Sequence, residues 1–311
     1  MSRRTPLALH RSLIAIWLLF PLVAQAKLNV VATFPDFGAL AREIGGDKID
    51  IVVLGKADRD PHFVEARGDF VAALRNADVL IEGGAGLERG WLPPLLQKAH
   101  NGKIDIGKPG RVEALTAVRL LEVSTNVAEA SDAHPNGNPH CTVDPVIAKT
   151  VAQQIAKSFA AVDRANAAFY DANCNKFQTA IDKRLQWWRG ALQLLHEQHA
   201  VAYHDSWPYF ARRFDLKIDI FLEPHPGVPP SASQLSDVIQ RMKRDHINTI
   251  IVEPYQDRRI VDTVARATNA KVIELSQFPG GIAGTDSYTD LINQLVKRLG
   301  DALHAGVARR D

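Results

Sequence analysis

The sequence lacks several features that would assign it to common functional classes. It has no run of Lys or Arg residues, and beyond residue 26 its formal charge is close to zero, which argues against a nucleic-acid partner. The glycine-rich stretch 83–86 has neither the dinucleotide fingerprint nor the P-loop lysine, so we interpret it as a plain turn. The apolar run 13–23 is too short to span a bilayer, which needs about 20 residues.

Cysteine is equally scarce, because the 311 residues include only Cys141 and Cys174. In an oxidising compartment such a pair is compatible with a disulfide bond. Two buried thiols, or Cys141 acting as an extra metal ligand beside His140, are the alternatives. The sequence leaves all three open, because it does not give the Cα separation that a bridge requires.

Residues 1–26 have the features of a secretory signal peptide. Arginines come first, an apolar run follows, and Ala24-Gln25-Ala26 forms an A-x-A cleavage site. The residues after Arg3-Arg4 fit a twin-arginine signal poorly, so ordinary secretion is expected. No cysteine lies near the cleavage point, so we do not expect a lipid anchor. We predict a mature protein that begins near Lys27 and is soluble outside the cytoplasm.

Hydrophobic periodicity predicts buried strands that alternate with helices through the rest of the chain. The predicted strands are 28–34, 49–54, 77–82, about 112–115, 200–203, 218–222, 249–253 and 271–275. The predicted helices are 37–44, 69–76, 91–99, 144–162, 207–214, 233–244, 258–268 and 287–304. This order predicts an α/β fold with two lobes, each a four-stranded parallel sheet with flanking helices.

One further helical segment, 164–199, is longer than most helices of globular proteins and lies at the middle of the chain. We interpret it as a bridge between the lobes. The predicted organisation is therefore a signal peptide (1–26), an N-terminal metal-binding lobe (27–163), the bridging helix (164–199) and a C-terminal metal-binding lobe (200–311).

Four potential metal ligands lie where loops meet predicted elements. His62 and His140 each follow a proline in the first lobe, whereas His204 ends a strand and Asp286 opens the last helix in the second lobe. In open parallel sheets, ligands bind beyond the carboxyl ends of the strands. All four residues follow strands in that direction, so we expect them to converge on one cleft between the lobes.

Each of these residues also has an ordinary structural role as an alternative. An Asp before a helix is a common N-cap, which fits Asp286 as well as ligation does. Glu223, Glu253 and Asp257 are rival carboxylates near strand ends. His134, in the polar loop before His140, either helps to pass metal inward or is simply exposed.

Three imidazoles and one carboxylate are a ligand set that suits Zn²⁺, whereas added carboxylates would favour Mn²⁺. A closed shell of four protein ligands leaves no position for an activated water. Such a site binds a metal ion without catalysing a reaction. A zinc-dependent hydrolase, with Asp286 or Glu253 as general base and water as the fourth ligand, is the alternative from the enzyme class.

Taken in order, the motifs of the chain resemble those of the solute-binding proteins of zinc and manganese ABC importers (cluster A-I). The resemblance covers about residues 27–303. The motifs that carry it are Asp60-Pro61-His62 with Glu65, Asn76-Ala77-Asp78, Asn138-Pro139-His140 with Asp144-Pro145, His204-Asp205 with Tyr209-Phe210, Pro230-Ser231-Ala232-Ser233-Gln234-Leu235, and Asp286-Ser287-Tyr288.

The resemblance implies two lobes joined by one long helix, with the metal ion between them. It implies His62, His140 and His204 as imidazole ligands and Asp286 as the carboxylate ligand. Histidine at position 204 implies a zinc-type member. The implied function is non-enzymatic: a periplasmic receptor, expected to be a monomer, that delivers Zn²⁺ to a membrane permease, with a periplasmic zinc chaperone as a further candidate partner.

Two departures from the family pattern qualify this expectation. The long His-rich loop of many zinc members is replaced by a short loop whose only histidine is His134, which weakens the case for a chaperone that docks there. The residue after the second histidine, commonly aromatic, is Cys141. A manganese receptor or an adhesin on the same fold is the alternative within the family.

Overall fold

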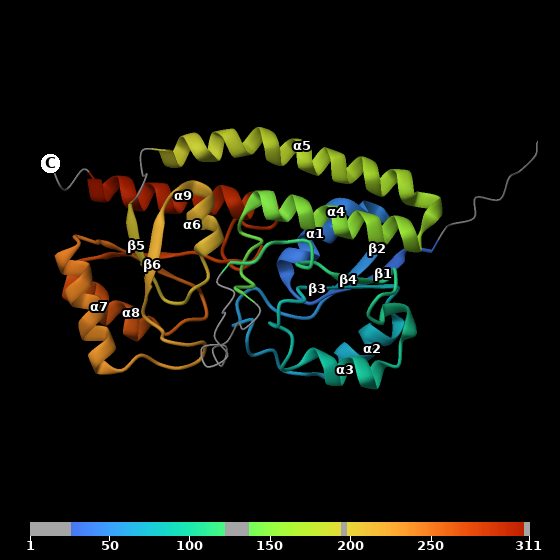
Figure 1. Cartoon of the computed structure of the whole chain (residues 1–311), viewed down its shortest axis with the longest axis horizontal. Coiled ribbons are helices and arrows are strands. Elements are labelled where there is room, and N and C mark those ends of the chain that lie inside the picture. Colours follow the sequence, from blue (N-terminus) through green and yellow to red (C-terminus); the bar gives the residue numbers. More distant parts are fainter. Residues whose placement is uncertain (1–25, 122–136, 194–197, 308–311) are drawn as a thin grey trace, which may run out of the picture.

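The computed structural model describes residues 26–121, 137–193 and 198–307. The predicted signal peptide (residues 1–25 of it) and His134 lie outside these ranges. Within them the chain forms two α/β lobes side by side, with long helices running along one side of both (Figure 1). The fold class predicted from the sequence is confirmed.

The first lobe is a parallel sheet with the strand order β2-β1-β3-β4. Its strands are β1 (Leu28–Ala32), β2 (Ile49–Val53), β3 (Val79–Glu82) and β4 (Arg111–Glu113). Its helices are α1 (Pro35–Gly45), α2 (Gly68–Asn76) and α3 (Leu92–Ala99). The central strand β3 is buried at every residue, as expected for a strand covered on both faces.

The second lobe repeats this plan, with the strand order β6-β5-β7-β8 and parallel pairing throughout. Its strands are β5 (His199–Ala202), β6 (Lys217–Phe221), β7 (Thr249–Val252) and β8 (Lys271–Glu274). Its helices are α6 (Pro208–Phe214), α7 (Ala232–Arg244) and α8 (Arg258–Thr268).

Three long helices lie along one side of the molecule: α4 (Pro145–Val162), α5 (Ala167–Leu192) and α9 (Tyr288–Val307) (Figure 1). Helix α5 contacts α1 and α4 of the first lobe and also α9, which packs on the second sheet. It is shorter than the predicted 164–199, because a 3₁₀ turn occupies 164–166 and His199 instead begins β5, paired with Lys217. No helix in the described ranges combines the length and apolar character needed to cross a bilayer.

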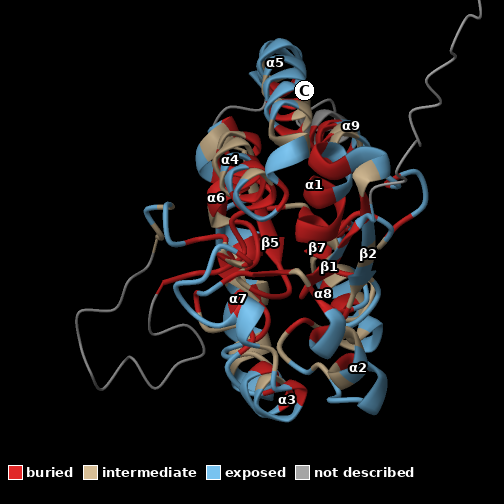
Figure 2. Ribbon diagram, turned by 90° about the vertical axis from the view of Figure 1, so that its right-hand side faces the viewer, coloured by how far each residue is buried: buried red, intermediate tan, exposed pale blue. Residues whose placement is uncertain are grey.

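The hydrophobic core is divided unequally between the lobes. One large cluster joins the first sheet to α1, α4, α5, α6 and α9, whereas a smaller cluster fills the outer part of the second lobe around β7, α7 and α8. Buried residues therefore concentrate under the long helices (Figure 2). Helix α6, which follows the strand end that carries His204, also packs into the large core.

The disulfide considered for Cys141 and Cys174 is absent, because both are free thiols buried in the large core. Cys174 instead accepts a hydrogen bond from the Gln178 amide at 3.1 Å. Burial, assisted by the charges of Asp36 and Asp144, raises the pKa of the Cys141 thiol well above its ordinary value. The thiolate form that a metal requires is thus disfavoured, and Cys141 does not join the histidine group described below.

Candidate metal centre

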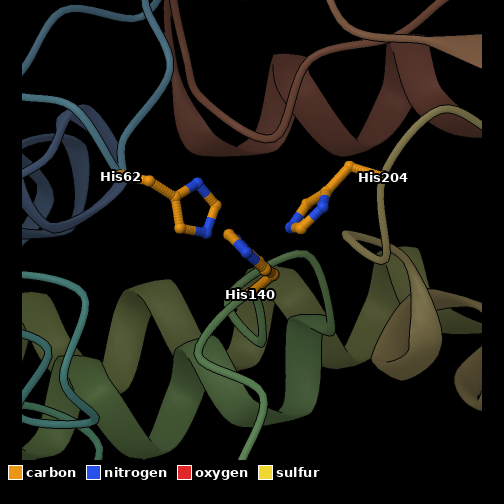
Figure 3. Close-up of side chains that lie close together, drawn as sticks. All are labelled: His62, His140 and His204. Atoms are coloured by element: carbon orange, nitrogen blue, oxygen red, sulfur yellow. The ribbon is translucent and has the colours of Figure 1, made fainter. Parts of the chain in front are cut away.

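Three histidines from distant parts of the chain meet between the lobes. His62 lies on the loop after β2, His140 on the turn before α4, and His204 directly after β5. One ring nitrogen from each lies within 4.8 Å of those of the other two, and the ring centroids are 5.0–5.3 Å apart. The rings surround one common space (Figure 3). Within the described ranges, no other group of His, Cys, Asp and Glu has this geometry.

The turn that carries His140 is fastened to the second lobe. The Asn138 side chain accepts a hydrogen bond from the His140 amide at 2.9 Å and donates one to the Asp205 carbonyl at 2.8 Å. The Tyr209 hydroxyl donates to the Asn138 carbonyl at 2.7 Å. Because Asp205 follows His204 directly, one asparagine fixes the spacing between two of the three histidines.

The end of the same turn is held just as firmly. Asp144 caps α4 by accepting a hydrogen bond from the Val146 amide, with Pro145 in the first turn, as the sequence predicts. The carboxylate also receives two hydrogen bonds from Arg213 of α6, at 2.8 and 2.9 Å, although it is fully buried. The Tyr288 hydroxyl of α9 donates to the Thr142 carbonyl at 2.7 Å.

Carboxylates hold the outer nitrogen of the other two histidines. Asp60 Oδ1 lies 2.7 Å from His62 Nδ1 and also accepts the His62 amide at 2.9 Å. Glu223 Oε2 lies 3.2 Å from His204 Nδ1, and Glu223 Oε1 accepts the Gly227 amide at 2.5 Å. A carboxylate on Nδ1 selects the tautomer in which Nε2 carries the lone pair for a metal ion.

The electrostatics of the Asp60–His62 pair agree with this role. Burial acts to raise the pKa of Asp60, but the hydrogen bonds and charge of His62, with a contribution from His204, outweigh it and lower the pKa below its ordinary value. Asp60 is therefore ionised at neutral pH and available to orient the imidazole.

The loop that carries His62 is packed much more loosely than the His140 turn. The next residue, Phe63, is 62% exposed, and residues of the loop line two cavities of about 510 Å³ each. One cavity is lined by His62, Gly90 and Trp91, and the other by Asp60, Phe34 and Tyr255. His62 is also the least buried of the three histidines.

The structure does not bring Asp286 into this group. Asp286 is exposed before α9, and Ser287 occupies the capping position that the sequence suggested for Asp286, because Ser287 Oγ accepts the Asp290 amide at 3.1 Å. The ligand role of Asp286 stays a prediction. Of the rival carboxylates, Glu223 contacts His204, Asp257 caps α8, and buried Glu253 accepts a hydrogen bond from Trp207.

The donor set fits a borderline divalent cation. Three neutral imidazoles from three separate loops supply nitrogen ligands. The carboxylates of Asp60 and Glu223 contact two of these imidazoles and offset the charge of the ion without joining the group. Sequence reasoning weighed Glu223 only as a rival ligand and missed its contact with His204. The Asp-Pro-His motif did contain a signal for Asp60, because the two-residue spacing lets an Asp side chain fold back onto a neighbouring residue.

Comparison with known proteins agrees with this geometry. Residues 30–302 match the family described as zinc-uptake complex component A, periplasmic (ZnuA). The high-affinity zinc uptake system protein ZnuA of Bacillus subtilis is 23% identical over 286 residues, covering 89% of this chain and 88% of that protein. The manganese ABC transporter substrate-binding lipoprotein PsaA of Streptococcus pneumoniae is 22% identical over 289 residues, covering 91% and 90%.

A solved structure gives the same relationship in three dimensions. The crystal structure of a ZnuA superimposes with a TM-score of 0.75 and 25% sequence identity, covering 89% of this chain and 99% of that one. The two-lobed fold is therefore shared with a protein of this type over nearly its whole length. Similar relatives include both zinc and manganese proteins.

Proposed function

The chain belongs to the zinc-uptake complex component A family of extracytoplasmic solute-binding proteins, which are not enzymes, and from this premise we propose that it is a periplasmic receptor for Zn²⁺. It captures one ion between its lobes through His62, His140 and His204. It then delivers the ion to the membrane permease of an ABC importer. The signal peptide 1–26 directs it to the periplasm.

The observation that supports zinc is a donor group made only of imidazoles, in which the nearby carboxylates contact the histidines and do not join the group. Neutral nitrogen ligands suit Zn²⁺, whereas Mn²⁺ gains more from carboxylate oxygens. The carboxylates nearest the group, Asp60 and Glu223, each engage the Nδ1 atom of a histidine. The fourth position is left for water, or for Asp286 after a movement of the segment before α9.

Capture is expected to depend on pH in one direction. Each histidine binds zinc as neutral imidazole, so protons compete with the ion. Affinity should therefore fall as the solution is acidified. The loaded receptor presents a shape to the permease that differs from the empty one mainly at the loosely packed His62 loop, because the His140 turn is already fixed.

The test is competition binding on metal-stripped mature protein with a chromophoric chelator, for Zn²⁺ and then Mn²⁺. The variant is His140→Ala, and the matched control is His100→Asn, which replaces an exposed histidine at the end of α3 with a residue that tolerates its left-handed backbone. We expect one tightly held zinc ion in wild type and control, and a loss of more than about a hundredfold in His140→Ala.

Other outcomes would change the proposal in defined ways. Zinc affinity that survives His140→Ala would remove the three-histidine site. Tighter binding of Mn²⁺ than of Zn²⁺ would keep the receptor and change its cargo. Binding tests with a periplasmic zinc chaperone would show whether this receptor accepts metal from a partner protein.

A further inference from the structure

The cavity lined by Asp60 has further walls that take no part in the metal site. Its volume is about 510 Å³, within the range of small-molecule pockets. Aromatic rings form much of its lining: Phe34, Phe63 and Phe70 come from the first lobe and Tyr255 from the second. The cavity therefore lies between the lobes, directly behind the residues that position His62.

One wall of this cavity is rigid. Phe34 is buried, stacks on Phe278 with ring centroids 5.8 Å apart, and meets Trp91 edge-on at 6.0 Å. The opposite wall reaches across to the second lobe, because the Phe63 ring lies so close to Gly227 that an added Cβ there would come within 2.6 Å of it. Flat apolar surfaces of this kind can pack against the aromatic ring of a ligand.

The rim of the cavity is cationic. Lys56 and Arg59 line it and are exposed, and among the described residues neither makes an ion pair. The third cation, Arg67, is already paired with Asp69. Of the two carboxylates in the lining, Asp60 is engaged with His62, which leaves Glu65 to offset only part of the charge of Lys56 and Arg59.

Tyr255 adds a neutral hydrogen-bond donor to this lining. Its hydroxyl accepts a hydrogen bond from the Gln277 amide at 3.1 Å, so its own proton remains available for another acceptor. Burial, assisted by the charges of Glu253 and Asp60, raises the pKa of Tyr255 well above its ordinary value. The hydroxyl therefore stays protonated over the physiological range.

We propose that this cavity is a second ligand site, which binds a small carboxylate anion with an aromatic body beside the metal ion. The aromatic walls accept the ring, and Lys56 and Arg59 attract the carboxylate by charge-assisted hydrogen bonds. This inference rests on the proposed function only for the neighbouring metal ion, because the cavity exists without it. An occupied cavity would support the loosely packed His62 loop from behind.

The probe is benzoate, a carboxylate that binds metal ions too weakly to strip zinc from a protein. Its neutral isostere benzamide has the same ring without the charge. Binding is measured by isothermal titration and ligand-observed NMR on metal-free and zinc-loaded full mature protein. The variant is Lys56→Gln/Arg59→Gln, and the matched control is Lys108→Gln/Arg164→Gln, which removes two exposed cations outside the cavity.

We expect wild type and control to bind benzoate more tightly than benzamide, and the cavity variant to lose about tenfold or more in benzoate affinity. Its zinc affinity in the absence of benzoate should be unchanged or slightly tighter, because two positive charges are removed near the cation. The inference is overturned if benzoate does not bind to protein that still binds zinc. It is also overturned if benzoate affinity falls equally in both double variants. Either result leaves the proposed receptor function intact. Benzoate binding without zinc binding supports the cavity and overturns the receptor.

Discussion

The turn that carries His140 and the loop that carries His62 present the same type of ligand in opposite mechanical settings. The turn is buried, and side chains from α6 and α9 hydrogen-bond to its backbone or its capping carboxylate on both sides of the histidine. The loop lines two cavities and carries an exposed phenylalanine, Phe63. His204 belongs with the fixed half, because Asn138 ties its neighbour Asp205 to the turn.

This difference suggests how a receptor can bind tightly and still release its cargo. Two histidines held at a set spacing reduce the entropy that is lost when the ion binds. The third histidine, on a less packed loop, can leave the ion without disturbing the core. The metal-dependent change in shape should therefore be concentrated in residues 54–67.

Removing the anchor of the fixed half should have the largest effect. In Asp144→Ala the cap of α4 is lost and Arg213 loses its buried partner, so we expect the free energy of unfolding to fall by about 3 kcal/mol. Urea denaturation measures this. Asp69→Ala removes an exposed partner of Arg67 at the end of the His62 loop and serves as control, with an expected change under about 1 kcal/mol. Equal losses in the free energy of unfolding for the two variants would contradict the distinction between the fixed His140 turn and the loosely packed His62 loop.

The carboxylates behind the histidines should have the next largest effect, this time on binding. Asp60→Asn and Glu223→Gln keep the size of the side chains but remove the charge that orients Nδ1 of His62 and His204. We expect zinc affinity to fall by about 10–100-fold in each variant. Because His204 is held by its surroundings as well, the loss should be greater for Asp60→Asn. The reverse order, measured by chelator competition, would mean that His62 is the better-fixed ligand.

The fixed half also contains a buried acid, Glu253, which hydrogen-bonds to Trp207 at the start of α6. Burial, with some opposition from hydrogen bonds, raises the pKa of Glu253 to about 8 from an ordinary value of 4.5. The folded state therefore binds more protons than the unfolded state between about pH 4.5 and pH 8, so this group makes the protein less stable as pH rises through that window.

Glu253→Gln should remove this penalty. Between pH 5 and pH 8, the variant should gain roughly 1–2 kcal/mol in the free energy of unfolding relative to wild type. Urea denaturation at several pH values measures the difference. If the free energy of unfolding changes with pH in the same way for both proteins, Glu253 does not titrate in this range.

Asp286 should have the smallest effect. Its exposed position outside the histidine group predicts that Asp286→Ala changes zinc affinity by less than about threefold, within the range expected for screened surface charges. A hundredfold loss would instead establish it as the fourth ligand and would mean that the segment before α9 moves inward when zinc binds.

Most of the fold was predictable because it follows from local patterns. Apart from the end of the bridging helix, every predicted strand and helix in the described ranges is present within a few residues, since apolar runs bounded by turn residues define elements in a parallel α/β fold. The end of the bridging helix was wrong because residue 199 pairs with Lys217 in the second sheet. Helical periodicity in one segment carries no information about such a distant partner.

The site was predictable to a similar degree. The strand-end rule placed all three histidines correctly, because parallel strands direct the following loops to one edge. It failed to separate Asp286 from Glu223, because both lie near loop ends and only the tertiary structure determines which one contacts a histidine. The state of Cys141 and Cys174 was open for the same reason.

The central claim is that one zinc ion binds between His62, His140 and His204, and a crystal structure of the zinc-loaded protein with anomalous data at the zinc absorption edge tests it most directly. We predict a single anomalous peak about 2.0–2.1 Å from Nε2 of each histidine, with Asp60 and Glu223 still on the outer nitrogens of His62 and His204. A peak bound through Nδ1, or one located away from the three rings, would contradict the account.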